Sequence, residues 1–138
     1  MKFQRHALTG LALMLLLLFL AGCGRIQAAR ANQSSADIAV DLQIIPEAPA
    51  TQQASTLQIS LRDRNGGPID GATVTVEGDM THAGMTPVLA TARPAGGGRY
   101  TAALTWTMAG DWQITVKATL ADGRTAQRAF PLRVGEGH

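Results

Sequence analysis

The sequence predicts an all-β protein, built as two packed antiparallel sheets of about seven strands. From residue 36 onward, apolar and polar residues alternate with a period of two, which is the pattern of a strand with one buried face. Short clusters of Gly, Pro, Asn and Asp separate the alternating runs, as turns between strands do. No helical periodicity follows residue 22, so the sheets are expected to pack on each other.

Seven alternating runs follow one another along this part of the chain, and the apolar members of each run are expected to share one face of a strand. In chain order, they are Ile38, Val40, Leu42 and Ile44; Leu57, Ile59 and Leu61; Ala72, Val74 and Val76; Val88, Ala90 and Ala92; Tyr100, Ala102, Leu104 and Trp106; Trp112, Ile114, Val116, Ala118 and Leu120; and Phe130, Leu132 and Val134. The fourth run is the weakest, because two of its members are alanine.

Turn signals separate these runs at residues 65–68, 94–98, 109–111 and 122–123. Asp122-Gly123 is a strong signal for a two-residue hairpin. Seven short strands in one domain of about a hundred residues are typical of an immunoglobulin-like antiparallel β-sandwich. Residues 63–76 also resemble a strand-turn-strand unit of bacterial immunoglobulin-like domains. The cysteine pair of antibody domains is absent, so the prediction concerns architecture alone.

The first residues have the three parts of a secretory signal peptide. Lys2 and Arg5 are followed by an apolar run at residues 11–20, which is short for a permanent span of ~30 Å of hydrocarbon. Residues 20–23, Leu-Ala-Gly-Cys, resemble the lipobox of bacterial lipoproteins, in which the cysteine receives a diacylglyceryl group. We therefore expect a signal peptide at 1–22, a tether anchored to membrane lipid through Cys23 at 23–35, and the domain at 36–138. The expected location is the extracytoplasmic side of the cell envelope.

The charge of the processed chain excludes some partners. Removal of residues 1–22 takes away Lys2 and Arg5, which leaves ten basic and ten acidic residues. A neutral chain with interspersed charges has no electrostatic footprint for nucleic acid. It also lacks a polybasic patch for anionic lipid, so we expect neither nucleic acid nor a charged lipid surface as partner.

The sequence offers little for catalysis. The only cysteine is the expected lipidation site, and no Ser-His-Asp order, phosphate loop, zinc motif or paired carboxylate pattern is present. The glycines at 96–98 are not followed by a helix, as a phosphate-binding loop would be. The protein is therefore expected not to be an enzyme and to carry no organic cofactor.

One loop stands apart by its chemistry. Residues 78–87, Gly-Asp-Met-Thr-His-Ala-Gly-Met-Thr-Pro, place Met80, His82 and Met85 within six positions. Thioether sulfur is a soft, neutral donor and imidazole a borderline one, so this set suits Cu(I) or Ag(I) better than zinc, calcium or magnesium. In an extended segment Met80 and His82 project to the same side, and a turn at Gly84 can bring Met85 toward them.

Topology adds a fourth candidate ligand. In a sandwich of alternating antiparallel strands, the loop after the third run and the loop after the fifth emerge at the same end. The second loop contains Met108, which we expect near Met80, His82 and Met85. Trp106 and Trp112 flank that loop, and an indole face can shield a copper ion from water and add a cation–π contact.

Plainer interpretations stay open for most of these residues. Methionine is a common core filler, so Met80 or Met108 can simply close the open end of the sandwich. His82 can be an exposed loop residue. Trp106 and Trp112 continue the apolar phase of their strands, which favours core packing.

The order of these motifs resembles a known family. Residues 78–88 read Gly-x-Met-x-His-x-Gly-Met-x-Pro-Val, residues 97–100 read Gly-x-x-Tyr, and residues 106–116 read Trp-x-Met-x-Gly-x-Trp-x-Ile-x-Val. This pattern resembles the YtkA-like domains, and FixH-like proteins are similar. The resemblance covers roughly residues 36–134 and implies an immunoglobulin-like fold and a role in copper handling. It implies Met80, His82 and Met85 as copper ligands, with Met108 as a possible addition.

Two functions therefore remain from the sequence. The first is a lipid-anchored protein that binds Cu(I) and stores it or delivers it to a copper-transport or oxidase-assembly protein, with cytochrome oxidase assembly as one destination. The second is a cell-envelope interaction module without a metal, whose end loops contact a membrane-protein partner through adaptable methionines.

Overall fold

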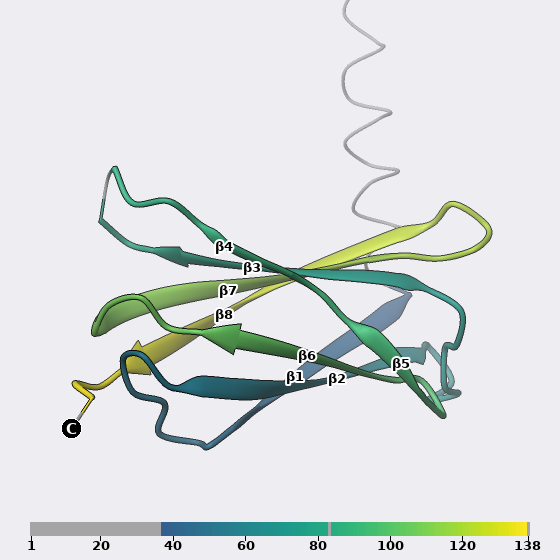
Figure 1. Ribbon diagram of the computed structural model, residues 1–138. Coiled ribbons are helices and arrows are strands. Elements are labelled where there is room, and N and C mark those ends of the chain that lie inside the picture. The colour runs from purple at the N-terminus through teal and green to yellow at the C-terminus, as the bar shows by residue number, and fades with distance from the viewer. Residues whose placement is uncertain (1–36, 83, 138) are drawn as a thin grey trace, which may run out of the picture. The chain divides into compact units, whose positions relative to one another are not determined.

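The computed structural model describes residues 37–82 and 84–137, so the expected signal peptide, Cys23 and the tether lie outside the described residues. The described chain forms eight strands and no helix (Figure 1). Their bounds are β1 Ile38–Ile45, β2 Ala54–Asp63, β3 Thr73–Met80, β4 Val88–Thr91, β5 Arg93–Gly96, β6 Arg99–Thr105, β7 Gly110–Thr119 and β8 Thr125–Val134. Within these residues no helix is long and apolar enough to cross a membrane.

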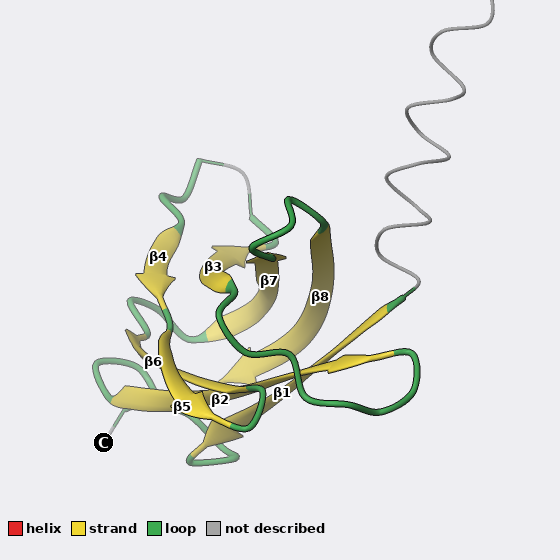
Figure 2. Ribbon diagram, turned by 90° about the vertical axis from the view of Figure 1, so that its right-hand side faces the viewer, coloured by secondary structure: helices red, strands yellow, loops and turns green. Residues whose placement is uncertain are grey.

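The strands form two four-stranded sheets with the orders β1-β2-β6-β5 and β4-β3-β7-β8. Every neighbouring pair in both sheets is antiparallel. Figure 2 shows the two sheets facing each other, which confirms the predicted immunoglobulin-like β-sandwich. The inward-facing residues of the two sheets meet between them and make one core.

The strand absent from the sequence prediction is β5, whose residues were assigned to a turn. The chain changes sheets at Ala92: β4 pairs with β3, whereas β5 pairs with β6. Ala92 is buried, and its amide donates to the carbonyl oxygen of Val74 at 2.9 Å, which fixes the crossing point. Pro94 is tolerated because β5 is an edge strand, where one row of amides needs no partner.

The core consists mainly of the residues that the alternation predicted. Trp106, Tyr100, Leu57, Ile59, Leu61, Ile114, Val74, Val76, Val116 and Val134 are its largest fully buried apolar side chains. The outer members of the first and last runs, Leu42, Ile44, Phe130 and Leu132, are only partly buried. They lie on β1 and β8, which are edge strands of different sheets, so each has a neighbouring strand on one side only.

Arg128 links the edge strands β8 and β1. Its Nη1 donates to the carbonyl oxygen of Val40 at 2.8 Å, and its guanidinium lies 5.0 Å from the ring centroid of Phe130. The same nitrogen lies 3.5 Å from the carboxylate of Asp41. Arg128 therefore occupies an inward-phase position of β8 but holds its charge at the surface.

The sandwich has two ends with different residues. One end, here called the methionine rim, consists of residues 46–53, 81–82, 84–87, 106–109 and 135–137. Hydrogen bonds join these segments: the amide of Gln52 donates to the carbonyl oxygen of Trp106 within one sheet, and that of Thr51 donates to the carbonyl oxygen of Gly135, which follows β8 of the other sheet. The rim lies at the left of Figure 1.

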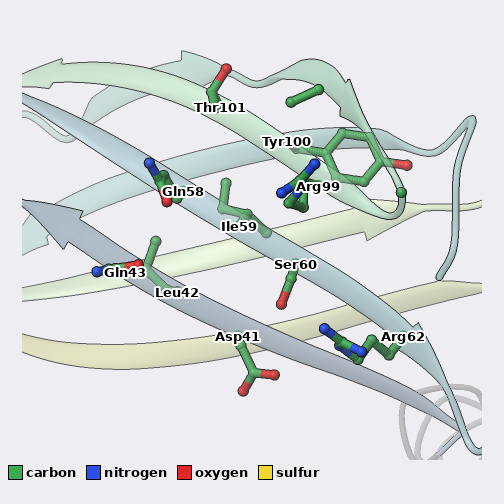
Figure 3. Close-up of a pocket in the computed structure, with 12 residues that line it drawn as sticks. Asp41, Leu42, Gln43, Gln58, Ile59, Ser60, Arg62, Arg99, Tyr100 and Thr101 are labelled. Carbon is green, nitrogen blue, oxygen red and sulfur yellow. The ribbon is translucent and has the colours of Figure 1, made fainter. Parts of the chain in front are cut away.

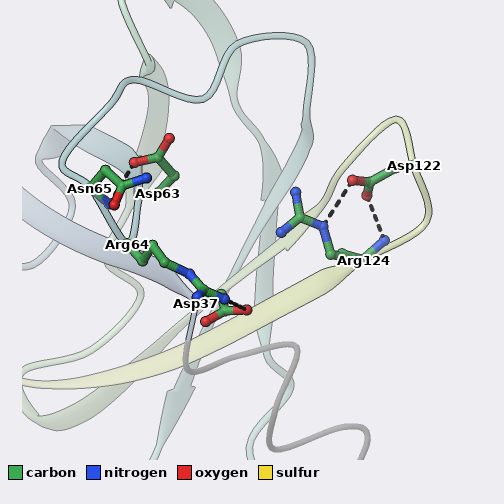
Figure 4. Close-up of polar contacts among 6 residues, drawn as sticks. All are labelled: Asp37, Asp63, Arg64, Asn65, Asp122 and Arg124. Atoms are coloured by element: carbon green, nitrogen blue, oxygen red, sulfur yellow. Dashed lines mark hydrogen bonds and ion pairs between the residues drawn. The ribbon is translucent and has the colours of Figure 1, made fainter.

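The opposite end, here called the Asp37 end, is where the described chain begins. The Asp37 carboxylate pairs with the Arg64 guanidinium at 2.8 Å, and the Asp63 carboxylate accepts the amide of Asn65 at 2.8 Å (Figure 4). Since Ile38 pairs with Asp63 and Ile45 with Thr56, strand β1 runs from this end to the methionine rim. The chain therefore enters the domain at the end away from the methionines.

Candidate functional site

The structure brings the two candidate loops to one rim. Strand β3 ends where β7 begins, with Met80 opposite Trp112 in the register. Beyond that pair, the amide of Thr81 donates to the carbonyl oxygen of Asp111 at 3.3 Å, and the Thr81 hydroxyl lies 3.5 Å from the same oxygen. The loop that carries His82 and Met85 is thereby tied to the strand that follows Met108.

Met80 lies in the core. Its side chain is 8% exposed, and its Cε methyl packs against Gly110, where an added β-carbon would be 3.0 Å away. The inward phase of β3 that buries Val74 and Val76 continues through Gly78 to Met80. Met80 therefore makes the contacts that are expected of a methionine that fills the core.

The other three candidate ligands are more accessible. His82 is exposed, Met85 is half-buried and packs against the edge of the core, and Met108 is 47% exposed. They lie in two loops that the Thr81–Asp111 hydrogen bonds hold at the same rim. The rim thus offers one imidazole and two thioethers to solvent in different degrees, with a third thioether in the core beside Gly110.

The two tryptophans pack in the core. Trp106 and Trp112 meet edge to face, with ring centroids 5.4 Å apart and an interplanar angle of 73°. The indole of Trp106 donates to the hydroxyl of Ser55 at 2.8 Å. The indole of Trp112 donates to the carbonyl oxygen of Met108 at 3.0 Å, so this buried ring also positions the backbone of a candidate ligand.

The charges around the rim favour cations. Four carboxylates lie in the rim or within two residues of it, whereas Arg133 is the one Lys or Arg side chain there among the described residues. They belong to Glu47, Asp79, Asp111 and Glu136. Arg133 donates to Asp111 at 2.7 Å, and this hydrogen bond raises the pKa of the guanidinium. Sequence reasoning missed this acidic bias, because the four residues are far apart in the chain.

The carboxylates of the rim do not gather into one cluster with other charged or imidazole donors. Within the described residues, no group of three His, Cys, Asp or Glu side chains is placed to hold a metal. The excess of carboxylates at the rim raises the local concentration of cations.

A comparison with known families identifies the family of the chain. The model of the family described as YtkA-like matches residues 32–117. The chain belongs to the YtkA-like family. All three motif segments at residues 78–88, 97–100 and 106–116 fall inside the match. The further likeness of this YtkA-like domain to FixH-like proteins stays a prediction.

Solved structures resemble the YtkA-like domain in fold. A superoxide reductase (neelaredoxin) from Ignicoccus hospitalis is 11% identical, with a TM-score of 0.50 over 69% of this chain and 79% of that one. The Lin-41 filamin domain is 12% identical, with a TM-score of 0.50 over 73% of this chain and 94% of that one. At such identities the likeness shows a shared β-sandwich alone. No curated protein matches the sequence at a significant level.

Proposed function

We propose that this YtkA-like protein is an extracytoplasmic, lipid-anchored carrier of Cu(I). The observation that carries the proposal is the tie between Thr81 and Asp111, because it holds the His82/Met85 loop and the Met108 loop at one rim. An acidic surrounding raises the local concentration of cations, and soft neutral donors select Cu(I) or Ag(I) from them.

The exposure of the donors suits exchange rather than storage in a closed cage. His82 and Met108 are the first groups that an arriving ion can meet, and Met85 lies at the edge of the core. Met80 can complete the set only if its side chain leaves the contact with Gly110. A site with two or three accessible neutral ligands releases Cu(I) readily, as transfer to a copper-transport or oxidase-assembly protein requires. The proposal assigns no reaction to the protein.

The direction of the chain supports a role at the membrane. Asp37, where the described residues begin, lies at the end of the sandwich away from the methionine rim. An anchor on Cys23 would therefore be joined to the domain through its Asp37 end. Cys23→Ser should abolish incorporation of labelled fatty acid and release the protein from membranes, whereas Arg25→Gln should change neither.

An anaerobic titration with Cu(I), followed by native mass spectrometry of the full-length chain in detergent, tests the metal site. We expect the parent to bind one Cu(I), and His82→Ala with Met85→Ala to lose the bound ion. Thr86→Ala is a matched control, because it changes the same loop without removing a donor. Equal binding by the double variant and the parent would refute the proposal.

A second candidate function is an interaction module without a metal, and one observation favours it. The large apolar side chains that are exposed in the described chain, Ile45, Leu89 and Met108, all lie in the methionine rim or within two residues of it. Such side chains suit contact with an apolar patch of a membrane protein. Cross-linking to a membrane partner that is lost in Met108→Ser with Leu89→Ser, but unchanged by a copper chelator, would favour this function.

A further inference from the structure

The outer face of the β1-β2-β6-β5 sheet carries a polar groove that is separate from the methionine rim. It has a volume of about 590 Å³ and crosses all four strands (Figure 3). The register places its polar side chains in two rows. Asp41 is opposite Ser60 and Ser60 opposite Arg99, while Gln43 is opposite Gln58 and Gln58 opposite Thr101.

The arginines of the described chain divide into two groups. Four of them, Arg64, Arg124, Arg128 and Arg133, form ion pairs with carboxylates. The remaining three, Arg62, Arg93 and Arg99, have no carboxylate partner among the described residues.

All three unpaired arginines belong to one face. Arg62 and Arg99 line the groove, and Arg93 pairs in register with Thr101, which also lines it. Among the described residues, Arg99 makes one hydrogen bond, in which its Nε donates to the carbonyl oxygen of Gly96 at 3.3 Å. The two terminal nitrogens of its guanidinium are therefore available to a ligand. The Asp41 carboxylate is the one acidic group in the lining, and Arg128 approaches it from β8 at 3.5 Å. The groove therefore presents uncompensated positive charge on a chain that is otherwise balanced.

We infer that this groove binds an acidic glycan. A guanidinium matches the two oxygens of a carboxylate or phosphate. Two such groups adjoin Ser60: Arg62 lies two residues further along β2, and Arg99 lies opposite Ser60 on β6. The amides of Gln43 and Gln58 and the hydroxyls of Ser60 and Thr101 are both donors and acceptors, as sugar hydroxyls require. Ser60 and Thr101 are half-buried and form the floor, so a ligand would lie across the strands between the arginines.

A glycan fits this groove better than a lipid surface does. Membrane binding by a protein face is strengthened by apolar side chains that enter the headgroup region as well as by positive charge. The large apolar residues of the groove are buried or half-buried, only the small Ala95 among its apolar residues is exposed, and the exposed Ile45, Leu89 and Met108 do not line it. Most of the exposed side chains that line the groove are polar or charged.

Binding of the full-length chain in detergent to polygalacturonate, to a phosphorylated mannan and to neutral dextran tests the inference. We expect binding to one or both acidic polymers and none to dextran, and the comparison shows whether a carboxylate or a phosphate is preferred. Affinity should fall by about tenfold for each of Arg62→Gln and Arg99→Gln, since a hydrogen bond to a charged group is lost. It should also fall as salt concentration rises.

A control variant removes two positive charges elsewhere on the domain. Lys117→Gln with Arg124→Gln changes the opposite sheet and an exposed hairpin, so it should bind the acidic glycan as the parent does. An equal loss in this control would mean a nonspecific charge effect and would overturn the inference. Binding to anionic phospholipid vesicles that is lost with Arg62→Gln and Arg99→Gln, without glycan binding, would also overturn it in favour of a lipid headgroup. Neither result depends on copper binding at the rim.

Discussion

The Cε methyl of Met80 lies against Gly110, so close that a β-carbon on Gly110 would be 3.0 Å from it. Gly110 also has a φ of 135°, which side-chain-bearing residues rarely adopt. Gly110→Ala should therefore lower the free energy of unfolding by about 1–3 kcal/mol, measured in urea. Gly123→Ala is a control for backbone strain alone, because Gly123 has a φ of 86° and open space around it. If Met80→Ala does not relieve part of the loss at Gly110, the contact has no energetic importance.

The hydrogen bond between Trp106 and Ser55 should contribute to stability because both partners are buried. Trp106 is 0% and Ser55 1% exposed. Trp106→Phe would leave the Ser55 hydroxyl without a partner and reduce the packed volume. We expect a loss of about 3 kcal/mol or less in the free energy of unfolding from the unpaired hydroxyl, with a further loss from the smaller ring. A double-mutant cycle with Ser55→Ala isolates the hydrogen bond, and a coupling energy near zero would contradict this account.

Tyr100 should hold the segment that leads into β3. Its hydroxyl donates to the carbonyl oxygen of Ile69 at 2.8 Å and accepts the amide of Ala72 at 3.1 Å, while the ring is fully buried. Tyr100→Phe removes both bonds and keeps the ring, so we expect a loss of about 1–3 kcal/mol. Hydrogen exchange gives a local measurement: the Ala72 amide should exchange faster. The Ala92 amide, bound to Val74, should change only as far as global stability does.

The sequence predicted most of the fold because each strand buries one face, and alternation records that face directly. It missed β5 because Pro94 and the glycines that follow are typical of a turn, and only the pairing with β6 makes this segment a strand. The same alternation also indicates the inward position of Met80, since Val74, Val76, Gly78 and Met80 share one phase. The glycine, which has no side chain, interrupts that pattern.

The ion pairs of the arginines could not be predicted from the sequence, for a different reason. Arg128 reaches Asp41 from 87 positions away, and Arg133 reaches Asp111 from 22 positions away. Which arginines are paired therefore depends on how β8 lies beside β1 and β7, and composition alone shows only a balanced total. Arg62 and Arg99 can be recognised as unpaired only after the carboxylate partners of the other arginines are known.

The hairpin at Asp122 gives a pH-dependent prediction. The Asp122 carboxylate accepts the Arg124 amide at 3.0 Å and the Arg124 Nε at 2.8 Å (Figure 4), and these bonds lower the pKa of Asp122, the backbone bond more than the side-chain bond. A carboxyl with a lower pKa in the folded state stabilises the fold above its unfolded pKa. That contribution is lost as pH falls through the folded value.

A carbon-detected NMR titration of the carboxyl groups checks this pKa. Arg124→Gln should raise the pKa of Asp122 only part of the way to its ordinary value, because the backbone hydrogen bond remains. Arg133→Gln, which removes an arginine at the other end of the sandwich, should leave it unchanged. An Asp122 that titrates at its ordinary value in the parent would show that the hairpin contacts are absent in solution.

The exposure of the methionines predicts unequal roles in Cu(I) binding. Met108 is 47% exposed and Met80 is 8% exposed, so an ion can reach the Met108 thioether without a change in the core. Met108→Leu should weaken Cu(I) binding by about tenfold or more, because the variant loses a soft ligand and keeps a similar volume. Met80→Leu should cost less than about 1.5 kcal/mol in stability and should weaken Cu(I) binding less than Met108→Leu does. Competition titrations with a chromophoric Cu(I) chelator measure both affinities under the same conditions. If Met80→Leu is the more damaging of the two, the buried thioether is the principal ligand, and the contact between Met80 and Gly110 must open for copper to bind.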